Sequence, residues 1–188
     1  MNVKSARTAA DSSLGKVSAI RVRRVTPSRW DDVVDLFVRK GPRGGDPVTN
    51  GCWCQYWFLR GRAFHDGFGN AHRKRLEAEV AKGDVHALLA YADGAPVGWC
   101  RLGPRDSFER LVHAPSAPKI DAEEKVWSVV CFYVHPAAKR SGVAKALLGH
   151  AIEHAAKKGA RILEGYAVRE GHMNMDAYTG YLPMYLEA

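Results

Sequence analysis

The sequence predicts a mixed α/β domain. Three observations support this prediction: alternating polar and apolar residues in 16–27, a hairpin pattern in 85–103, and an apolar run at 126–134 that leads into a helical pattern. The predicted order is strand, helix, loop, helix, three strands, helix, strand, helix. This order indicates an antiparallel meander followed by a right-handed crossover.

The N-terminal part divides into a leader and the start of the domain. Residues 1–15 are small, polar and weakly basic, so we expect a disordered leader, with the domain occupying 16–188. A strand is predicted at 16–27. Ser28 and Asp31 form a capping pair for the helix that follows, in which an apolar stripe recurs at helical spacing. The stripe consists of Trp30, Val33, Val34 and Phe37.

Residues 41–70 are predicted to be a long loop. Such loops are usually either functional or disordered, and the many aromatic residues here argue against disorder. A second helix is predicted at 71–82, ending at Gly83.

The second half contains the remaining elements. The hairpin at 85–103 turns at Asp93-Gly94, a pair typical of two-residue turns. A polar connection at 104–125 then leads to the strand at 126–134. A helix at 141–158, a strand at 161–168 and a short C-terminal helix complete the prediction.

Composition excludes several classes of protein. The chain has 188 residues and a formal charge of +8, but its basic residues are spread rather than clustered, so we expect no nucleic-acid partner. Because it lacks both a membrane-length apolar run and a secretory signal, we expect a cytoplasmic protein that does not bind membranes. The four cysteines lack the paired spacing of a zinc site, so we expect free thiols and no metal. They are Cys52, Cys54, Cys100 and Cys131.

The segment "HPAAKRSGVAKALL" (135–148) joins a strand to a helix. Amides at a helix start bind anions, and Lys139 and Arg140 add positive charge. Gly142 would allow a phosphate to approach the backbone closely. The segment contains neither a P-loop nor a dinucleotide fingerprint. A plain helix entry, in which the glycine serves only tight packing, is the alternative.

The same segment resembles the acyl-CoA-binding motif of the GCN5-related N-acetyltransferase (GNAT) superfamily. The matching residues are Val134, Pro136, Lys139, Gly142 and Ala144, with Lys139 where the family usually has Arg or Gln. The resemblance implies a mostly antiparallel sheet with splayed central strands, and acetyl-CoA as acyl donor. It also implies a set of residues that bind the cofactor: Phe132, Tyr133, Val134, Lys139, Arg140, Ser141, Gly142, Val143 and Ala144.

The resemblance also suggests catalytic and acceptor residues. Tyr185 stands where the family has a tyrosine that protonates the leaving thiolate, and an ordinary apolar-face tyrosine is the alternative. The general base stays open among a water chain and five polar residues: Glu109, Asp121, Glu124, Glu164 and His135. The segment 50–61 resembles a bacterial branch with a C-W-C-x-Y-W element, which implies an acceptor pocket. Its residues would be Trp53, Tyr56, Trp57 and Tyr178; a hydrophobic plug over the sheet is the alternative.

The resemblance implies two more strands after the last helix, and we expect the domain at 16–188 to lack them. A partner that covers the open edge, for example in a homodimer, would avoid aggregation. The leading hypothesis is an acetyl-CoA-dependent N-acetyltransferase that acts by direct attack on a primary amine of a small molecule or protein. The alternative is a non-catalytic acyl-CoA sensor.

Overall fold

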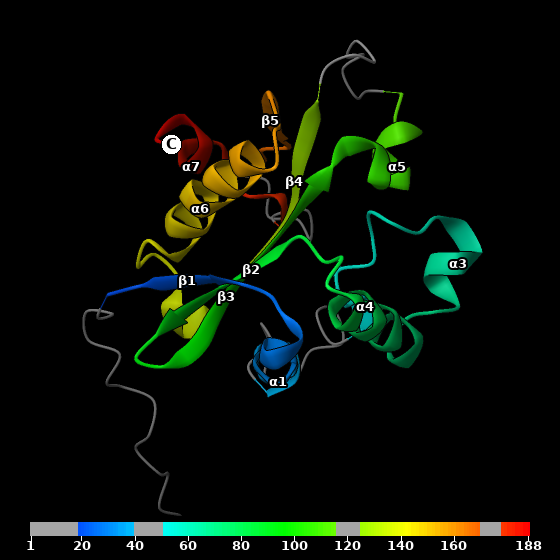
Figure 1. The fold of residues 1–188 in the computed structure, drawn as a ribbon, viewed down its shortest axis with the longest axis horizontal. Helices are drawn as coiled ribbons and strands as arrows, with labels where there is room; N and C mark the ends of the chain where they lie inside the picture. The colour runs from blue at the N-terminus through cyan, green and yellow to red at the C-terminus, as the bar shows by residue number, and fades with distance from the viewer. Residues whose placement is uncertain (1–18, 40–50, 116–124, 170–177) are drawn as a thin grey trace, which may run out of the picture.

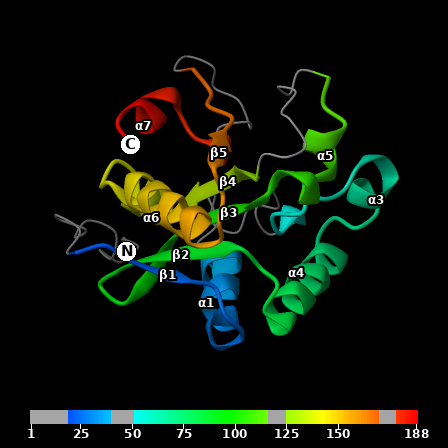
Figure 2. The ribbon, with the colours of Figure 1, turned by 45° about the horizontal axis from the view of Figure 1, so that its top comes forward.

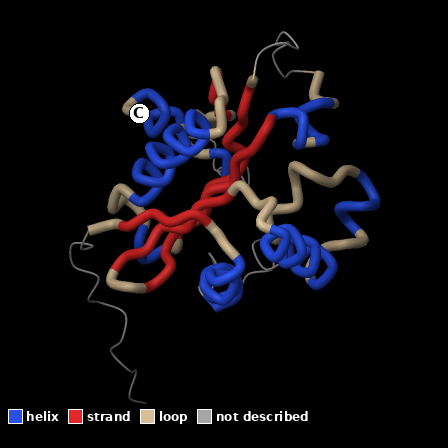
Figure 3. Tube along the Cα trace, in the orientation of Figure 1, coloured by secondary structure: helices blue, strands red, loops and turns tan. Residues whose placement is uncertain are grey.

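The computed structural model of the protein describes residues 19–39, 51–115, 125–169 and 178–188. In these residues the chain forms a five-stranded sheet flanked by helices (Figures 1 and 3). Strands β1 to β4 are antiparallel to their neighbours, and β5 runs parallel to β4. The predicted mixed α/β fold is therefore confirmed. The predicted leader lies outside the described residues, and the lack of two final strands stays a prediction.

The strands lie in the sheet in the order of the sequence, so the first four form a meander and α6 provides the crossover to β5. The β2–β3 hairpin turns at Asp93 and Gly94, as predicted. Their φ angles of 50° and 80° are typical of a two-residue turn of type I′. The strands are β1 (Arg21–Arg24), β2 (Ala87–Ala92), β3 (Ala95–Pro104), β4 (Val126–Val134) and β5 (Ile162–Gly165).

Helices cover both faces of the sheet. α6 and α7 lie on one face, and α1 and α4 lie on the other (Figure 2). None of the helices among the described residues is long and apolar enough to span a membrane. The helices are α1 (Trp30–Val34), α3 (Gly61–His65), α4 (Asn70–Lys82), α5 (Glu109–Val112), α6 (Val143–Lys157) and α7 (Leu182–Leu186).

Two large apolar cores result, one on each face, beside a smaller one of Phe108, Leu111 and Val130. On the α6 face, Leu147 and Ala151 of α6 pack with Leu88 and Leu102 of the sheet. On the other face, side chains of α1, of the residues that follow it, of Trp53 and of α4 pack against β2, β3 and β4. This second core includes Val33, Leu36, Phe37, Trp53, Leu76, Val80, Leu89, Trp99 and Tyr133.

The structure corrects the sequence prediction at two places. The first helical segment begins at Pro27, not after Ser28, because proline fits the first position of a helix and lacks the amide hydrogen that would need a partner. The expected capping pair of Ser28 and Asp31 is therefore wrong; the Ser28 hydroxyl lies 3.0 Å from that of Thr26. The short helices α3 and α5 also appear where only loop was predicted, since four or five residues carry no readable periodicity.

Gly98 of β3 sets how closely α6 approaches the sheet. A Cβ at this position would lie 2.6 Å from Cγ1 of Val143. We expect Gly98→Ala to lower the free energy of unfolding by about 1–3 kcal/mol through overpacking. Gly149, exposed on α6 with nothing within 4 Å of its Cβ position, is the control. Gly149→Ala should raise the same quantity by up to about 1 kcal/mol. Urea unfolding measures both, and equal effects would contradict this packing argument.

A pair of histidines lies under the far end of α6. The His154 Nε2 atom is 3.4 Å from Nδ1 of His86, and His86 also packs on Trp127 with 4.7 Å between ring centroids. Burial, followed by nearby His154 and Lys158, lowers the pKa of His86 to about 4. Burial also lowers the pKa of His154. Both imidazoles are therefore neutral in the folded protein at pH 7.

These histidines predict how stability depends on pH. Between about pH 4 and the ordinary histidine pKa near 6.5, the unfolded chain binds more protons than the folded one. The free energy of unfolding should therefore fall as pH falls through this window. His86→Gln should flatten the fall, and His113→Gln, at an exposed histidine, should not. Urea unfolding at pH 7 and pH 5 tests this, and an unchanged slope in His86→Gln would refute it.

Candidate active site

The turn between β4 and α6 presents backbone amides at the start of a 15-residue helix. Arg140 and Gly142 have φ angles of 60° and 87°, and Ser141 between them lies outside the left-handed region. Such alternation makes a concavity of N–H groups that suits anions. Among the described residues no side chain caps the first turn of α6, whose amides also lack intrahelical partners. This turn is therefore a candidate anion site.

The side chains of the turn suit the same role. Lys139 and Arg140 are exposed, and the Ser141 hydroxyl donates to the carbonyl of Ala138 at 2.7 Å. A Cβ on Gly142 would meet only Cδ1 of Ile20, at 3.8 Å, so the left-handed φ restricts this position more than space inside the protein does. The structure brings six of the predicted cofactor residues into one turn: Lys139, Arg140, Ser141, Gly142, Val143 and Ala144.

Strand β4 parts from β5 shortly before this turn. β5 pairs with β4 only up to Val129, although β4 continues to Val134. The β3–β4 register also shifts here and leaves Val130 as an extra residue in β4. Beyond this bulge, Phe132 packs in the core on the α6 face and Tyr133 in the core on the other face. The predicted splay of the central strands is therefore present.

Tyr185 of α7 fills the space where the strands part. Its ring packs edge-on against Phe132 with 6.4 Å between centroids, and a Cβ on Gly165 at the end of β5 would lie 2.3 Å from Cε1 of Tyr185. Its hydroxyl donates to the carbonyl of Thr179 at 2.6 Å. Burial raises the pKa of Tyr185, so the hydroxyl stays protonated at neutral pH.

An aromatic cavity of about 460 Å³ lies on the opposite face of β4. Three of the four predicted pocket residues line it, namely Tyr56, Trp57 and Tyr178. The sequence analysis did not assign the other ten lining residues to this pocket. One available signal was the alternation along β4, which puts Tyr133 on the face opposite Phe132. The full lining is Phe37, Cys52, Cys54, Tyr56, Trp57, Phe64, Phe68, Trp99, Cys131, Tyr133, Tyr166, Tyr178 and Thr179.

Trp53 is not part of this wall, which corrects the prediction. It is 1% exposed and packs on Phe37 with 5.5 Å between ring centroids. Trp53 and Cys54 both have positive φ, 45° and 58°, which is rare for side chains of this size. This strained pair directs Trp53 into the core and leaves Cys54 on the cavity floor, where Nε1 of Trp99 donates to its sulfur at 3.4 Å.

A comparison with protein families identifies the chain. The model of the Acetyltransferase (GNAT) family matches residues 53–178, more than half of the sequence. This match includes the turn at residues 139–144 (the anion turn), the point where β4 parts from β5, and most of the cavity lining. The chain belongs to the GNAT acetyltransferase family. GNAT proteins are N-acetyltransferases that use acetyl-CoA, so the predicted family and enzyme class are confirmed. No curated protein sequence matches the chain significantly.

Solved structures show the same GNAT fold. The aminoglycoside acetyltransferase AAC(6')-Iy, in complex with the bisubstrate analogue CoA-S-monomethyl-acetylneamine, matches with a TM-score of 0.55 and 17% identity, over 87% of this chain and 91% of that one. A GCN5-related N-acetyltransferase from Ralstonia eutropha JMP134 matches with a TM-score of 0.52 and 15% identity, over 90% of each chain. At these identities the likeness concerns the fold.

The candidate bases of this GNAT chain do not reach the cavity wall. Glu164 of β5 accepts from the hydroxyls of Ser128 and Tyr166, each at 2.5 Å, and pairs with Arg105 at 3.1 Å. His135 uses its Nδ1 to accept the amide of Ala137. Within the described residues, no Asp, Glu or His side chain lines the cavity. The other acids considered from the sequence were Glu109, which is exposed on α5, and Asp121 and Glu124, which lie outside the described residues.

The cysteines are free thiols in contrasting environments. Burial raises the pKa of Cys52 to about 11. Burial would also raise the pKa of Cys54, but hydrogen bonding from Cys131, the charge of Arg101 and the Trp99 indole together lower it. No three Cys, His, Asp or Glu side chains in the described parts of the chain could hold a metal ion together. The cavity floor is therefore a thiol surface with one comparatively acidic sulfur.

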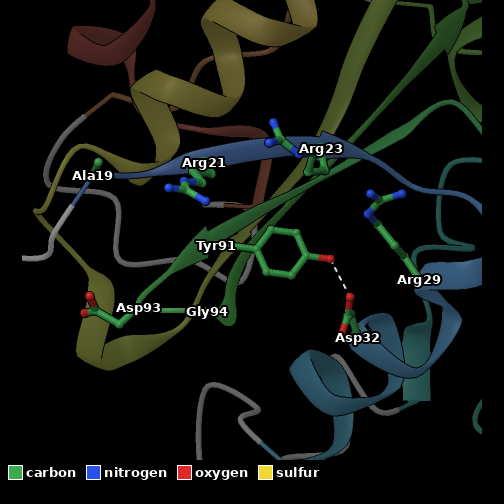
Figure 4. A pocket seen from close by; sticks show the side chains of 8 residues that line it. All are labelled: Ala19, Arg21, Arg23, Arg29, Asp32, Tyr91, Asp93 and Gly94. Carbon is green, nitrogen blue, oxygen red and sulfur yellow. Dashed lines mark hydrogen bonds between the residues drawn. The ribbon is translucent and has the colours of Figure 1, made fainter.

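A second, more open cavity of about 650 Å³ lies at the other edge of the sheet (Figure 4). The Tyr91 hydroxyl donates to Oδ2 of Asp32 at 2.5 Å across it, and Arg29 donates to Thr26. It shares no lining residue with the aromatic cavity. Its lining is Ala19, Arg21, Arg23, Arg29, Asp32, Tyr91, Asp93 and Gly94.

Proposed function

We propose that this GNAT protein transfers the acetyl group of acetyl-CoA to a primary amine by direct attack within a ternary complex. One observation carries the proposal: β4 connects the two parts of the candidate site. The turn at residues 139–144 follows the end of β4, and the aromatic cavity lies against one face of the same strand. Phe132 faces the α6 side, whereas Cys131 and Tyr133 line the cavity. A thioester placed along β4 beyond Val129 would thus lie beside the cavity.

The turn supplies the groups that a diphosphate needs. Amides at the start of α6 and the helix dipole favour a negative charge by about 0.3–1 kcal/mol, or up to about 2 kcal/mol when partly buried. Lys139 and Arg140 add two cations. Because lysine is a point charge without the fork of arginine, we expect Lys139 to hold phosphate less specifically than the arginine usual in the family. We place the extended arm of acetyl-CoA along β4 from Val130 to Val134, where β5 has ended.

The reaction asks for a neutral amine and a protonated leaving group. The amine nitrogen bonds to the acetyl carbon, the carbon–sulfur bond breaks, the nitrogen loses a proton to water, and the CoA thiolate takes one from Tyr185. Tyr185 then regains a proton from water, so that no net proton is consumed. Deprotonating a lysine-like amine at pH 7 costs about 4–5 kcal/mol, against about 1 kcal/mol for an α-amine. Since burial raises the pKa of Tyr185, its proton must transfer as the thiolate departs.

A non-catalytic acyl-CoA sensor is the second candidate function. The observation that favours it is the cavity wall, which carries no carboxylate or imidazole among the described residues. Release of free CoA thiol in the presence of an amine separates the two functions. A sensor would bind acetyl-CoA and release none.

Calorimetric titration tests the cofactor site. We expect wild type to bind acetyl-CoA and desulfo-CoA with micromolar affinity, and Gly142→Trp to bind at least about tenfold more weakly because the side chain would cover the amides. Gly149→Trp, on the exposed side of the same helix, is the matched control and should bind as wild type does. No binding by wild type, or equal binding by Gly142→Trp, would overturn the assignment.

Tyr185→Phe tests the proposed acid. We expect kcat to fall about a hundredfold or more while the Kd of acetyl-CoA stays unchanged, because only the proton donor is lost. Tyr181→Phe, at a neighbouring tyrosine that is 44% exposed, should keep wild-type kcat. Steady-state thiol release and calorimetry give the two constants. An unchanged kcat in Tyr185→Phe would mean that water protonates the thiolate.

A further inference from the structure

The aromatic cavity lacks fixed charge. Nine of its thirteen lining side chains are aromatic, and the others are three cysteines and Thr179. In the described parts of the chain, no Asp, Glu, Lys, Arg or His belongs to the wall. An ammonium group moved from water into such a cavity would lose its hydration without gaining a counter-ion. The wall itself offers a cation only the faces of its aromatic rings, so the charged groups at the rim decide whether a cation is accepted.

Described charges that contact the lining residues disfavour a cationic ligand. The Arg110 guanidinium lies 4.0 Å from the ring centroid of Tyr56 and 5.4 Å from that of Phe64, so a positive charge already occupies the aromatic faces at the rim. Glu164, whose carboxylate accepts from the hydroxyl of the lining residue Tyr166, is also paired with Arg105. A ligand with several ammonium groups would meet repulsion here.

The shape of the cavity suits a small ring or hydrocarbon body. Its volume of about 460 Å³ lies within the usual range for small-molecule sites, about 300–1,000 Å³. Trp57 stacks on Tyr166 with 5.7 Å between ring centroids, and Tyr56 stands edge-on to Trp57 at 5.3 Å. Such rings bind another ring through stacked and edge-to-face contacts.

We propose that the acceptor is a small monoamine with an aromatic or branched hydrocarbon body, which binds to the aromatic cavity in its uncharged form. This inference rests on the proposed acetyl transfer and specifies its substrate class. Because no base lines the wall, the enzyme acts on the neutral fraction of the amine present in solution. The rate constant kcat/KM should rise tenfold for each pH unit until the pKa of the acceptor is reached.

An acceptor panel tests the proposal on the full chain. We would follow thiol release from acetyl-CoA with phenethylamine, n-propylamine and spermidine at pH 8. We expect kcat/KM for phenethylamine to exceed that for spermidine at least about tenfold, because only the former enters without charge repulsion. Spermidine preferred over phenethylamine would overturn the acceptor class and leave acetyl transfer standing.

The variant Trp57→Ala tests whether the preference for phenethylamine arises in the aromatic cavity. It should lower kcat/KM for phenethylamine about tenfold, mainly through KM, and leave propylamine within about threefold, because only the ring contact is lost. Tyr91→Ala removes a ring from the other cavity and is the matched control. Thermal unfolding of both variants checks that they fold. Equal losses for both amines in Trp57→Ala would overturn the placement of the acceptor.

A binding measurement separates failure of the acceptor class from failure of acetyl transfer. Phenethylamine is titrated into the desulfo-CoA complex, with tryptophan fluorescence as the signal. Binding without turnover would support the acceptor class and overturn acetyl transfer. If acetyl-CoA binds but phenethylamine does not, the acceptor class is wrong.

Discussion

The short ladder between β4 and β5 is the constraint on which the rest of the site depends. It ends at Val129, where the bulge at Val130 also turns the strand away from its neighbour. Had β5 continued beside β4, the ring of Tyr185 could not lie against Gly165. Because backbone groups in a folded protein need hydrogen-bond partners, a strand that outruns its neighbour suits a ligand that is itself an extended amide chain. The arm of acetyl-CoA has that character.

The other face of the sheet is held by a partly buried ion pair. The Arg101 guanidinium lies 2.7 Å from Glu79 of α4 and also packs 4.6 Å from the ring centroid of Phe58. Burying such a pair gives little net stability, because desolvation offsets most of the attraction. The ion pair instead fixes positions. It holds α4 against β3 through Glu79, and the packing of Phe58 on Arg101 holds the segment that follows the strained Trp53 and Cys54. The cavity floor is therefore set by electrostatics and strain as much as by apolar packing.

The sequence predicts the anion turn, which is the charged half of the candidate site, better than the aromatic cavity, which is the apolar half. The anion turn is contiguous, so the spacing of Lys139, Gly142 and Ala144 suffices to identify it. The cavity is assembled from six separate segments, and Tyr166 joins it only because β5 lies parallel to β4. Trp53 was misplaced for a related reason: its direction depends on a positive φ, which no propensity of tryptophan would suggest.

The excess of positive charge links the two halves. The chain carries a formal charge of +8, and exposed cations stand at the turn while Arg110 stands at the cavity rim. Such a field raises the local concentration of an anionic ligand such as acetyl-CoA and lowers that of a polycation. A GNAT protein that acetylates polycations needs acidic groups near its acceptor to reverse this field. This chain instead neutralises Glu164 and Glu79 with Arg105 and Arg101. In the proposed reaction, the charges that favour the acetyl donor would thus also restrict the acceptor.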